Sequence, residues 1–553
     1  MISSTDITRS LSEAGLPDVA TMAKWANEFF RDVPAQSETP APRPDAQTVT
    51  TLTEDQLRSL PATMNAATAP IQTAESTAAW PEIPGGVAAS NFSIAPSFSF
   101  LEEARSLFVK ATPIPVPAEA AALKTPSLDP SKLDAAAFSD VSSVPFDVGA
   151  IRRDFPILQE KINGRQLVWL DNAATTHKPR PVIDRLSFFY AHENSNIHRA
   201  AHTLAARATD AYEAAREKVR RFLGASSSRE IVFVRGATEG INLVAQSWGR
   251  RNIQKDDEIV ITWLEHHANI VPWQMLCAEK GARLRIAPVD NSGQVLLDEY
   301  EKLLNAHTKL VAFAHVSNAL GTITPVQDMI AAAHRHGAKV LVDGAQAVSH
   351  LRVDVQTFDC DFYVFSGHKV FAPTGIGVVF GKADVLETMP PWQGGGNMIA
   401  DVTFEKTQFQ TPPGRFEAGT GSIGDAVGLG AAIDYLERIG MVNVARHEHD
   451  LLLYATEALN RIPGLHLIGT AREKASVLSF VLDGFRTEDV GTALNQEGIA
   501  VRAGHHCAQP ILRRFGVETT VRPSLALYNT CEDVDALVNA IWNLKQGRRP
   551  SVI

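Results

Sequence analysis

The sequence predicts an α/β fold with a mostly parallel central sheet, a smaller α+β part after it, and a long amino-terminal segment that belongs to neither. Three observations predict this division. Short apolar runs alternate with amphipathic stretches from Leu167 onward, which is typical of buried parallel strands and their connecting helices. Longer helical stretches follow from Gly424. The first 146 residues hold 16 of the 31 prolines but only 3 of the 36 glycines.

The amino-terminal segment, residues 1–146, is acidic and rich in Pro, Ala, Ser and Thr. It has 17 Asp and Glu against 9 Lys and Arg, and it has no histidine. Each proline removes a backbone donor and restricts the residue before it, so we expect a largely disordered extension. Two stretches, Asp18–Phe30 and Phe98–Val109, place apolar residues on one helical face. We interpret them as docking segments.

The apolar runs that follow predict strands buried on both faces, because each run is short, nearly continuous and bounded by polar or turn residues. Helical stretches such as Met329–His336 separate several of them, so the strands are expected to run mostly parallel. The runs are Leu167–Leu170, Ile231–Val234, Ile259–Ile261, Leu310–Ala314, Val340–Val342, Phe362–Phe365 and Gly377–Phe380.

The carboxy-terminal part predicts long helices with a few short strands between them, which indicates a smaller α+β unit. Thr530 and Asp533 form a capping signal for the last helix. The long helices are predicted at Asp425–Ile439 and Val442–Ile462 and the final one at Glu532–Lys545, with the shorter segments Ala475–Leu482, Asp489–Gln496 and Val501 between them.

Composition excludes several classes of function. A net charge of −10 with a pI near 6.0 gives no basic surface for nucleic acid. No apolar run approaches the roughly 18 residues that cross a bilayer, and no basic segment followed by an apolar stretch marks a secretory signal. The chain has 4 cysteines, too few for a disulfide framework at this length. We therefore expect a cytoplasmic protein that binds neither nucleic acid nor membrane.

A lysine and an aspartate follow neighbouring apolar runs. Asp343 ends the run Val340–Val342, and Lys369 comes just after Phe362–Phe365. Pyridoxal 5'-phosphate needs this pair, with a carboxylate against its pyridinium nitrogen and an amine on its aldehyde. The turn Arg235–Asn242 follows a strand and opens a helix, where free N–H groups and the helix dipole can hold a phosphate. The sequence therefore predicts an enzyme with this cofactor.

Three ordered motifs resemble those of the cysteine desulfurases of the second, SufS-like group, which are fold-type I enzymes of aminotransferase class V. They are Asp343-Gly344-Ala345-Gln346, Ser366-Gly367-His368-Lys369 and Arg502-Ala503-Gly504-His505-His506-Cys507-Ala508. Several motifs in the right order are far more specific than any one of them. The resemblance covers residues 146–547 and implies a large cofactor-binding domain at 169–434, with residues 147–168 and 435–553 forming a small domain.

The resemblance implies which residues hold the phosphate group. Thr238, Ser366 and His368 match the side chains that the family uses there. Thr420 matches a threonine that reaches the phosphate of the partner subunit, which implies a homodimer. The residues after it, Gly421-Ser422-Ile423, depart from the proline-containing continuation of the relatives.

Further cofactor contacts are implied for His266, Gln346 and Asn318. His266 matches the imidazole that stacks on the pyridine ring and serves in proton transfer. Gln346 matches the amide that binds the phenolate oxygen, and Asn318 matches a residue that holds cofactor and substrate. A metal site at His266-His267 is excluded on the expectation that both lie on a strand, where adjacent side chains point to opposite faces.

The resemblance also implies the residues that meet the substrate. Arg522 matches the arginine that clamps the substrate carboxylate, a task that suits a planar guanidinium with two parallel donors. Arg502 lies in the Cys507 segment, near the entrance of the site in relatives. Cys507 sits in a polar loop with two imidazoles, which favours an exposed, ionisable thiol. The other cysteines, Cys277, Cys360 and Cys531, lack such surroundings and are interpreted as structural.

The function implied is conversion of L-cysteine to L-alanine with a persulfide on Cys507. A selenocysteine lyase or cysteine sulfinate desulfinase could use the same site and need the thiol less. A catalytically degenerate shell-cargo protein is a further alternative, which the complete set of Asp343, Gln346, Lys369, Cys507 and Arg522 disfavours. A transaminase remains open on the fold alone, but it gives the Cys507 loop no task.

The implied partners are a second copy of the chain, L-cysteine and a sulfur-acceptor protein, which in relatives serves iron–sulfur cluster assembly. Some SufS-like desulfurases carry a long extension of similar composition that loads them into encapsulin shells. Residues 1–146 resemble such an extension and are interpreted as a shell-targeting arm with several weak contacts. The alternative is a tail that packs loosely on the enzyme's own surface. A transit peptide is disfavoured because such peptides are poor in acids.

Overall fold

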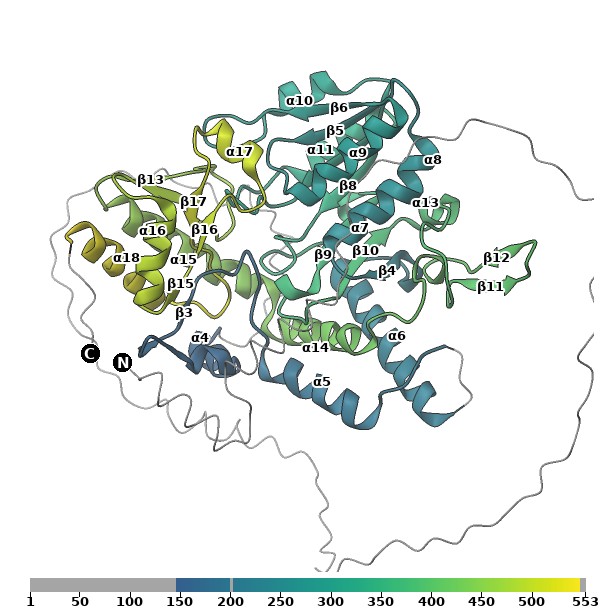
Figure 1. Cartoon of the computed structure of the whole chain (residues 1–553), viewed down its shortest axis with the longest axis horizontal. Coiled ribbons are helices and arrows are strands. Elements are labelled where there is room, and N and C mark those ends of the chain that lie inside the picture. Colours follow the sequence, from purple (N-terminus) through teal and green to yellow (C-terminus); the bar gives the residue numbers. More distant parts are fainter. Residues whose placement is uncertain (1–145, 199–201, 548–553) are drawn as a thin grey trace, which may run out of the picture. The chain divides into compact units, whose positions relative to one another are not determined.

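The computed structural model describes residues 146–198 and 202–547 (Figure 1). The predicted extension, apart from Phe146, lies outside the described residues, as do its two docking segments. The chain divides into two units, Met1–Ala122 and Leu123–Ile553, and every element described below belongs to the second.

Among the described residues the largest sheet has seven strands, most of them parallel. β9, β8, β7, β5 and β6 pair in parallel, whereas β10 is antiparallel to both of its neighbours. In spatial order the strands are β4 (Ile231–Val234), β10 (Gly377–Gly381), β9 (Phe362–Ser366), β8 (Lys339–Asp343), β7 (Thr308–Ala314), β5 (Glu258–Thr262) and β6 (Arg283–Ala287). The prediction of a mostly parallel sheet is confirmed.

Alternate residues of these strands enter two different apolar clusters, so the sheet is buried on both faces. On β7, Val311 and Phe313 join one cluster with helices α6 (Thr203–Leu223), α11 (Val326–Arg335) and α14 (Ile423–Ile439). Leu310 and Ala312 join the other cluster with α7 (Ala237–Val244) and α9 (Val271–Lys280). The period of two along a strand explains this division. It also explains why the runs read as continuously apolar in the sequence.

The helices cover these faces and the smaller sheets (Figure 1). They are α4 (Val148–Arg153), α5 (Arg180–His192), α6 (Thr203–Leu223), α7 (Ala237–Val244), α8 (Arg250–Asn252), α9 (Val271–Lys280), α10 (Leu297–Leu303), α11 (Val326–Arg335), α12 (Val355–Phe358), α13 (Ala383–Thr388), α14 (Ile423–Ile439), α15 (Met441–Asn460), α16 (Thr487–Gln496), α17 (Gln509–Arg514) and α18 (Cys531–Lys545). At the start of α18 the predicted capping box is present between Thr530 and Asp533.

A second, antiparallel sheet follows in the carboxy-terminal part, and α15, α16 and α18 pack with it around a separate apolar cluster. Its strands are β13 (Leu465–Leu467), β14 (Phe480–Leu482), β17 (Thr520–Arg522) and β16 (Arg502–Gly504). The remaining pairs are β15 (Ile499–Ala500) with β3 (Val168–Trp169), β1 (Lys161–Ile162) with β2 (Arg165–Gln166), and β11 (Ile399–Val402) with β12 (Thr407–Phe409).

One strand prediction needs correction, and one strand of the large sheet was not predicted. The run Leu167–Leu170 is not part of the seven-stranded sheet, because its strand β3 pairs in parallel with β15 of the carboxy-terminal part. The strand β6 was not predicted, since its alternation of Arg283, Leu284 and Arg285 breaks the apolar pattern at the edge of the sheet. The predicted boundary between residues 434 and 435 falls inside α14, and the division into two domains stays a prediction.

A buried ion pair joins α6 to the segment that follows β12. Glu417 accepts two hydrogen bonds from the Arg216 guanidinium, at 2.6 and 3.0 Å, and one from the Phe233 N–H at 2.8 Å. The Arg216 side chain is 3% exposed and that of Glu417 is 7% exposed. Because a buried guanidinium without its carboxylate loses both pairing and solvation, its partner has a large effect on stability.

We expect Glu417→Ala to lower the free energy of unfolding by about 3 kcal/mol, because it removes the buried carboxylate and leaves Arg216 paired only with Glu213, whose side chain is 43% exposed. Urea denaturation followed by circular dichroism measures this change. The matched control is Asp434→Ala, which removes the partner of Lys218 from a solvent-exposed ion pair and should cost less than about 1 kcal/mol. Equal losses in the two variants would contradict the assignment.

Candidate active site

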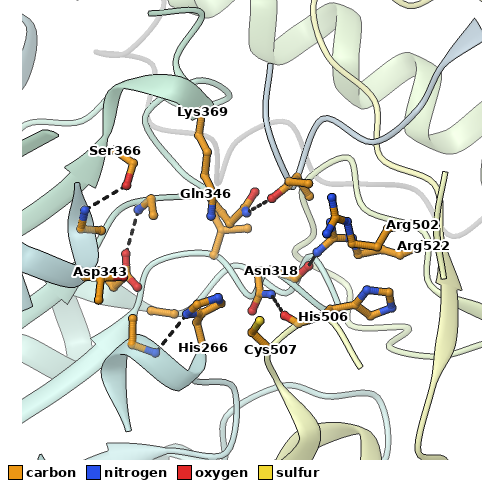
Figure 2. Close-up of a pocket in the computed structure, with 18 of the residues that line it drawn as sticks. His266, Asn318, Asp343, Gln346, Ser366, Lys369, Arg502, His506, Cys507 and Arg522 are labelled. Atoms are coloured by element: carbon orange, nitrogen blue, oxygen red, sulfur yellow. Dashed lines mark hydrogen bonds between the residues drawn. The ribbon is translucent and has the colours of Figure 1, made fainter. Parts of the chain in front are cut away.

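Eleven of the twelve predicted site residues line one cavity of about 530 Å³. The cavity lies where the carboxyl ends of β8 and β9 meet the turn before α7 and the loop after β16. Such an edge of an open α/β sheet is the usual place for a ligand. The residues are Thr238, His266, Asn318, Asp343, Gln346, Ser366, His368, Lys369, Arg502, Cys507 and Arg522. Figure 2 labels all of them except Thr238 and His368. Thr420 instead lines a separate cavity with Trp392 and Glu417.

Asp343 and Lys369 occupy neighbouring strand ends, as the sequence predicts. Asp343 is the last residue of β8, and its carboxylate accepts a hydrogen bond from the Ala345 N–H at 2.9 Å. Burial raises the pKa of Asp343, and the Lys369 amine opposes that shift. Lys369 closes the short 3₁₀ turn Gly367–Lys369 after β9, and burial lowers its pKa to about 8. A neutral lysine amine is therefore accessible near physiological pH.

A cup of donors forms at the start of α7. The Ala237 N–H donates to Ser366 Oγ at 2.9 Å, and Thr238 lies in the first turn of the helix. His368 Nδ1 lies 3.2 Å from the Thr175 hydroxyl, and burial lowers the pKa of His368 to about 4. A helix amino terminus beside a hydroxyl and a neutral imidazole suits an anionic ligand such as phosphate.

His266 is neutral, and one hydrogen bond fixes its tautomer. Burial, followed by the nearby Lys369 charge, lowers its pKa to about 3. Its Nδ1 accepts from the Ala268 N–H at 3.0 Å, so the ring proton resides on Nε2. The expectation that His266 and His267 lie on a strand is wrong: His267 begins a 3₁₀ turn after β5. Among the described residues no cluster of His, Cys, Asp or Glu fits a metal ion.

The Cys507 loop has a constrained backbone. His506 and Cys507 both have φ of +53°, which residues other than glycine rarely adopt. Three hydrogen bonds hold this conformation: the His267 N–H donates to the Cys507 carbonyl at 2.8 Å, Asn318 Nδ2 donates to the His506 carbonyl at 2.7 Å, and the Cys507 N–H donates to His505 Nδ1 at 3.0 Å. Cys507 is nevertheless exposed, as its polar loop predicts, and its role as a nucleophile stays a prediction.

The other cysteines differ from Cys507 in their surroundings. Cys277 and Cys360 are buried, and burial raises the pKa of the Cys277 thiol to about 11. Burial also raises the pKa of Cys360. Cys531 is exposed at the start of α18, so it is not a core residue, and its thiol pKa is raised by partial burial and by the nearby Glu532. None of the three lines the cavity.

Two arginines reach the cavity from β16 and β17. The Arg522 side chain is 2% exposed, and its Nη1 donates to the Asn318 carbonyl at 2.9 Å. Burial lowers the pKa of Arg522 to about 10, so it stays a cation at neutral pH. Arg502 is half exposed and lies at the cavity wall. Figure 2 shows both guanidinium groups on the side of the cavity that faces Asn318 and His506.

Sequence reasoning missed Asp171, which binds both arginines. Its carboxylate accepts from Arg502 Nη2 at 2.9 Å and from Arg522 Nη2 at 3.3 Å. The only sequence signal is an acid directly after the apolar run Leu167–Leu170, the same position that Asp343 holds after the run Val340–Val342. The partners of Asp171 lie 331 and 351 residues away along the chain, so no local pattern indicates them.

Several buried polar atoms around the cavity lack a hydrogen-bond partner among the described residues. They are Asn318 Oδ1, Arg522 Nε and His506 Nδ1. Buried polar groups are nearly always paired in folded proteins, so such atoms indicate a ligand. Gln346 differs, because its Nε2 donates to the Ala173 carbonyl at 2.6 Å; its contact with a cofactor oxygen stays a prediction.

In the described part of the chain no helix is long and apolar enough to span a membrane.

Comparisons with known proteins agree with this geometry. The aminotransferase class-V family matches residues 168–537. A cysteine desulfurase of Synechococcus elongatus is 69% identical over 405 residues, which are 73% of this chain and 65% of the relative. The chain therefore spans just under two thirds of that relative's length. A cysteine desulfurase of Salmonella agona is 52% identical over 400 residues, which are 72% of this chain and 98% of the relative.

A solved structure gives the same result in three dimensions. The cysteine desulfurase CsdA of Escherichia coli superposes with a TM-score of 0.68 at 40% identity, over 73% of this chain and 99% of that chain. Because the class-V family matches most of the described residues and the Salmonella desulfurase is matched along nearly its whole length, the chain belongs to the cysteine desulfurases of the aminotransferase class-V family.

Proposed function

We propose that this chain is a pyridoxal 5'-phosphate-dependent cysteine desulfurase that converts L-cysteine to L-alanine and carries the sulfur as a persulfide on Cys507. One observation carries the proposal: an exposed cysteine shares a cavity with a lysine, an aspartate and a buried arginine. The lysine and the aspartate suit the cofactor, the arginine suits a carboxylate, and the thiol gives the reaction its sulfur chemistry.

The residues of the cavity fit the cofactor. Asp343 would face its pyridine nitrogen, Lys369 would hold its aldehyde, and Thr238, Ser366 and His368 would surround its phosphate. When bound, pyridoxal phosphate supplies a sink for the electron pair that remains after a proton leaves the α-carbon of an amino acid. The Lys369 amine has a pKa of about 8, so the pH dependence of cofactor binding can test this assignment.

Uptake of pyridoxal phosphate by cofactor-free protein is expected to accelerate as pH rises to about 8, the pKa of Lys369, and then to level off. Only the neutral amine can attack an aldehyde, and a lysine at its ordinary pKa of 10.5 would show no plateau there. Stopped-flow absorbance at a series of pH values measures the rate. In Asp343→Asn the midpoint should move to lower pH, because that carboxylate raises the lysine pKa. A rate that still climbs at pH 10 would contradict the assignment.

The chain's own residues then have distinct tasks in turnover. Arg522 binds the substrate carboxylate, and the free Lys369 amine removes the α-proton. His266 donates or returns a proton through Nε2, the nitrogen that bears it in the structure. The Cys507 thiolate attacks the substrate sulfur; the S–S bond forms as the Cβ–S bond breaks, and the carbon skeleton is released as alanine after protonation.

The direct test mixes purified holoenzyme with L-cysteine and measures two products, free alanine and persulfide on the Cys507 peptide. The proposal expects one persulfide per active site in a first turnover without an acceptor, with an equal amount of alanine. Alanine without persulfide would favour the alternative of a selenocysteine lyase or cysteine sulfinate desulfinase. Neither product would favour a degenerate enzyme.

The proposed partners follow from the same assignment. An acceptor protein with its own thiol collects the sulfur, and a second copy of the chain completes the enzyme as a homodimer. Thr420 supports the dimer because it lies outside the cofactor cavity of its own chain, and Phe404 supports it as a fully exposed aromatic residue beside β11. We further propose that residues 1–146 load the enzyme into an encapsulin shell in the cytoplasm. A variant beginning near Phe146 should then fail to load when co-expressed with a shell protein.

A further inference from the structure

His506 lines the cavity directly before the proposed nucleophile, and the proposed reaction gives its side chain no task. The residue is buried, with 6% of its surface exposed. Burial, followed by the nearby Arg522 charge, lowers the pKa of His506 to about 3. The imidazole is therefore neutral near physiological pH and carries its proton on one ring nitrogen only.

The contacts of His506 show which nitrogen carries this proton. Nε2 lies 3.1 Å from the Thr520 carbonyl oxygen and 2.8 Å from the Thr520 hydroxyl oxygen. Because a carbonyl oxygen only accepts, Nε2 is the donor and Nδ1 is left as an acceptor. Nδ1 has no hydrogen-bond partner among the described residues. The only ring proton is thus engaged by Thr520, which favours a positioning task over a task in proton transfer.

The Nε2 contact ties the Cys507 loop to β17, the strand that ends in Arg522. Thr520 is the first residue of β17 and Arg522 is the last, and they are 0% and 2% exposed. Arg522 Nη1 donates to the Asn318 carbonyl at 2.9 Å, and Asn318 Nδ2 donates to the His506 carbonyl at 2.7 Å (Figure 2). Residues that fix Arg522 therefore hold His506 at both its side chain and its backbone.

The tether matters because the backbone that it holds is unfavourable on its own. His506 and Cys507 both have φ of +53°, a region in which the Cβ atom crowds the backbone. Residues persist in such a conformation where the surrounding contacts hold them there. The contacts of His506 therefore help to fix the direction in which the Cys507 side chain leaves the backbone.

We propose that His506 is a positioning residue: its Nε2 hydrogen bonds to Thr520 hold the Cys507 thiol at a set separation from Arg522. This inference rests on the proposed function, because it takes Arg522 as the group that binds the substrate carboxylate. A thiol held at the right distance from that carboxylate meets the substrate sulfur with little loss of motion at the moment of attack. Binding of an amino acid to Arg522 does not itself need the tether.

Two variants separate the donor from the bulk of the ring. His506→Met fills a similar volume but has no donor, whereas His506→Gln carries an amide N–H at the same distance along the side chain as Nε2. In His506→Met we expect the first-turnover rate of persulfide formation on Cys507 to fall by roughly 10²-fold, the cost of a misplacement of about 1 Å. His506→Gln should recover most of this rate.

The rate is measured by mixing holoenzyme with L-cysteine without an acceptor, quenching at a series of times and mapping the Cys507 peptide by mass spectrometry. Isothermal titration calorimetry with L-alanine measures amino acid binding on the same holoenzyme. The Kd of L-alanine should stay close to that of wild type in both variants, because Arg522 and its contact with Asn318 are unchanged. A loss of rate without a loss of binding identifies a contact that acts during the attack.

A second readout does not depend on turnover. Hydrogen–deuterium exchange of the peptide that contains residues 505–508 reports how often the loop opens. The Cys507 and Ala508 N–H groups are both hydrogen-bonded to His505. Their exchange should be faster in His506→Met than in wild type and should slow again in His506→Gln.

The matched control is His447→Met. His447 Nε2 lies 2.9 Å from the Asn529 carbonyl oxygen, so this variant also removes a bond between an imidazole and a backbone carbonyl. His447 does not line the cavity. The persulfide rate and the exchange of the loop should both match wild type.

Several results would overturn the inference. They are an unchanged persulfide rate or unchanged loop exchange in His506→Met, a loss that His506→Gln does not recover, and an L-alanine Kd that rises as much as the rate falls. If His506→Met does not fold, Thr520→Val decides, because it removes the closer of the two acceptors and must exchange faster in the loop than Thr520→Ser. Wild-type holoenzyme that forms no persulfide would refute the proposed function, whereas the exchange results still decide the tether.

Discussion

Replacing Lys369 by alanine is expected to abolish turnover of L-cysteine and to remove the covalent attachment of the cofactor. The Lys369 amine is assigned two tasks, holding the aldehyde and removing the α-proton, and both are lost together. General base catalysis alone contributes roughly 10²–10⁴-fold to a rate, so activity should fall below detection. Borohydride reduction followed by peptide mapping measures the attachment, and alanine release measures turnover.

The matched control for this prediction is Lys474→Met. Burial lowers the pKa of Lys474 to about 7, comparable to that of Lys369, but its Nζ donates to the Leu320 and Gly469 carbonyls and does not line the cavity. This variant should retain the reduced adduct on Lys369. An adduct that persists in Lys369→Ala, or that maps to Lys474 in wild type, would contradict the assignment of Lys369 as the residue that holds the cofactor.

Replacing Cys507 by alanine is expected to leave the cofactor in place and to stop sulfur transfer. The visible absorbance of bound pyridoxal phosphate should match that of wild type, because Asp343, Lys369 and the phosphate cup are unchanged. Alanine release from L-cysteine should fall by at least about 10³-fold, since no other described thiol reaches the cavity. Alanine at position 507 is no more strained than cysteine at a φ of +53°, so the loop should keep its shape.

Cys531→Ala is the matched control, because it also removes an exposed thiol but does so outside the cavity. Cys531 is the other exposed cysteine of the described residues, and it lies at the start of α18, outside the cavity. Full activity is expected there. Desulfuration that survives in Cys507→Ala at the wild-type rate would exclude Cys507 as the nucleophile and favour a lyase that releases sulfur without a protein thiol.

Much of the fold was predictable because its strands are short, apolar and regularly separated. The run Ile231–Val234 coincides with β4, and the capping signal at Thr530 marks the start of α18. Most of the predicted site residues share one cavity because strand ends and the three sequence motifs lie around it. The prediction missed β6 because this strand has charged residues at alternate positions. It misplaced β3 because the partner of this strand lies more than 300 residues away along the chain.

The charge arrangement of the site could not be predicted from motifs. Asp171, Arg502 and Arg522 come from three separate segments, and only the folded chain shows that one acid binds two bases. The error at His266 and His267 has a similar cause, because β5 ends at Thr262 and the chain turns before it reaches them. These two residues do not have the strand geometry on which the exclusion of a shared metal ion relied.

The hydrogen bonds that hold the Cys507 backbone limit how far its sulfur can travel. With its carbonyl bound to the His267 N–H and the preceding carbonyl bound to Asn318, the loop cannot swing outward without breaking both. Delivery then depends on rotation about the cysteine side chain alone, a reach of only a few ångströms. In the proposed function, an acceptor would therefore have to bring its own thiol to the mouth of the cavity.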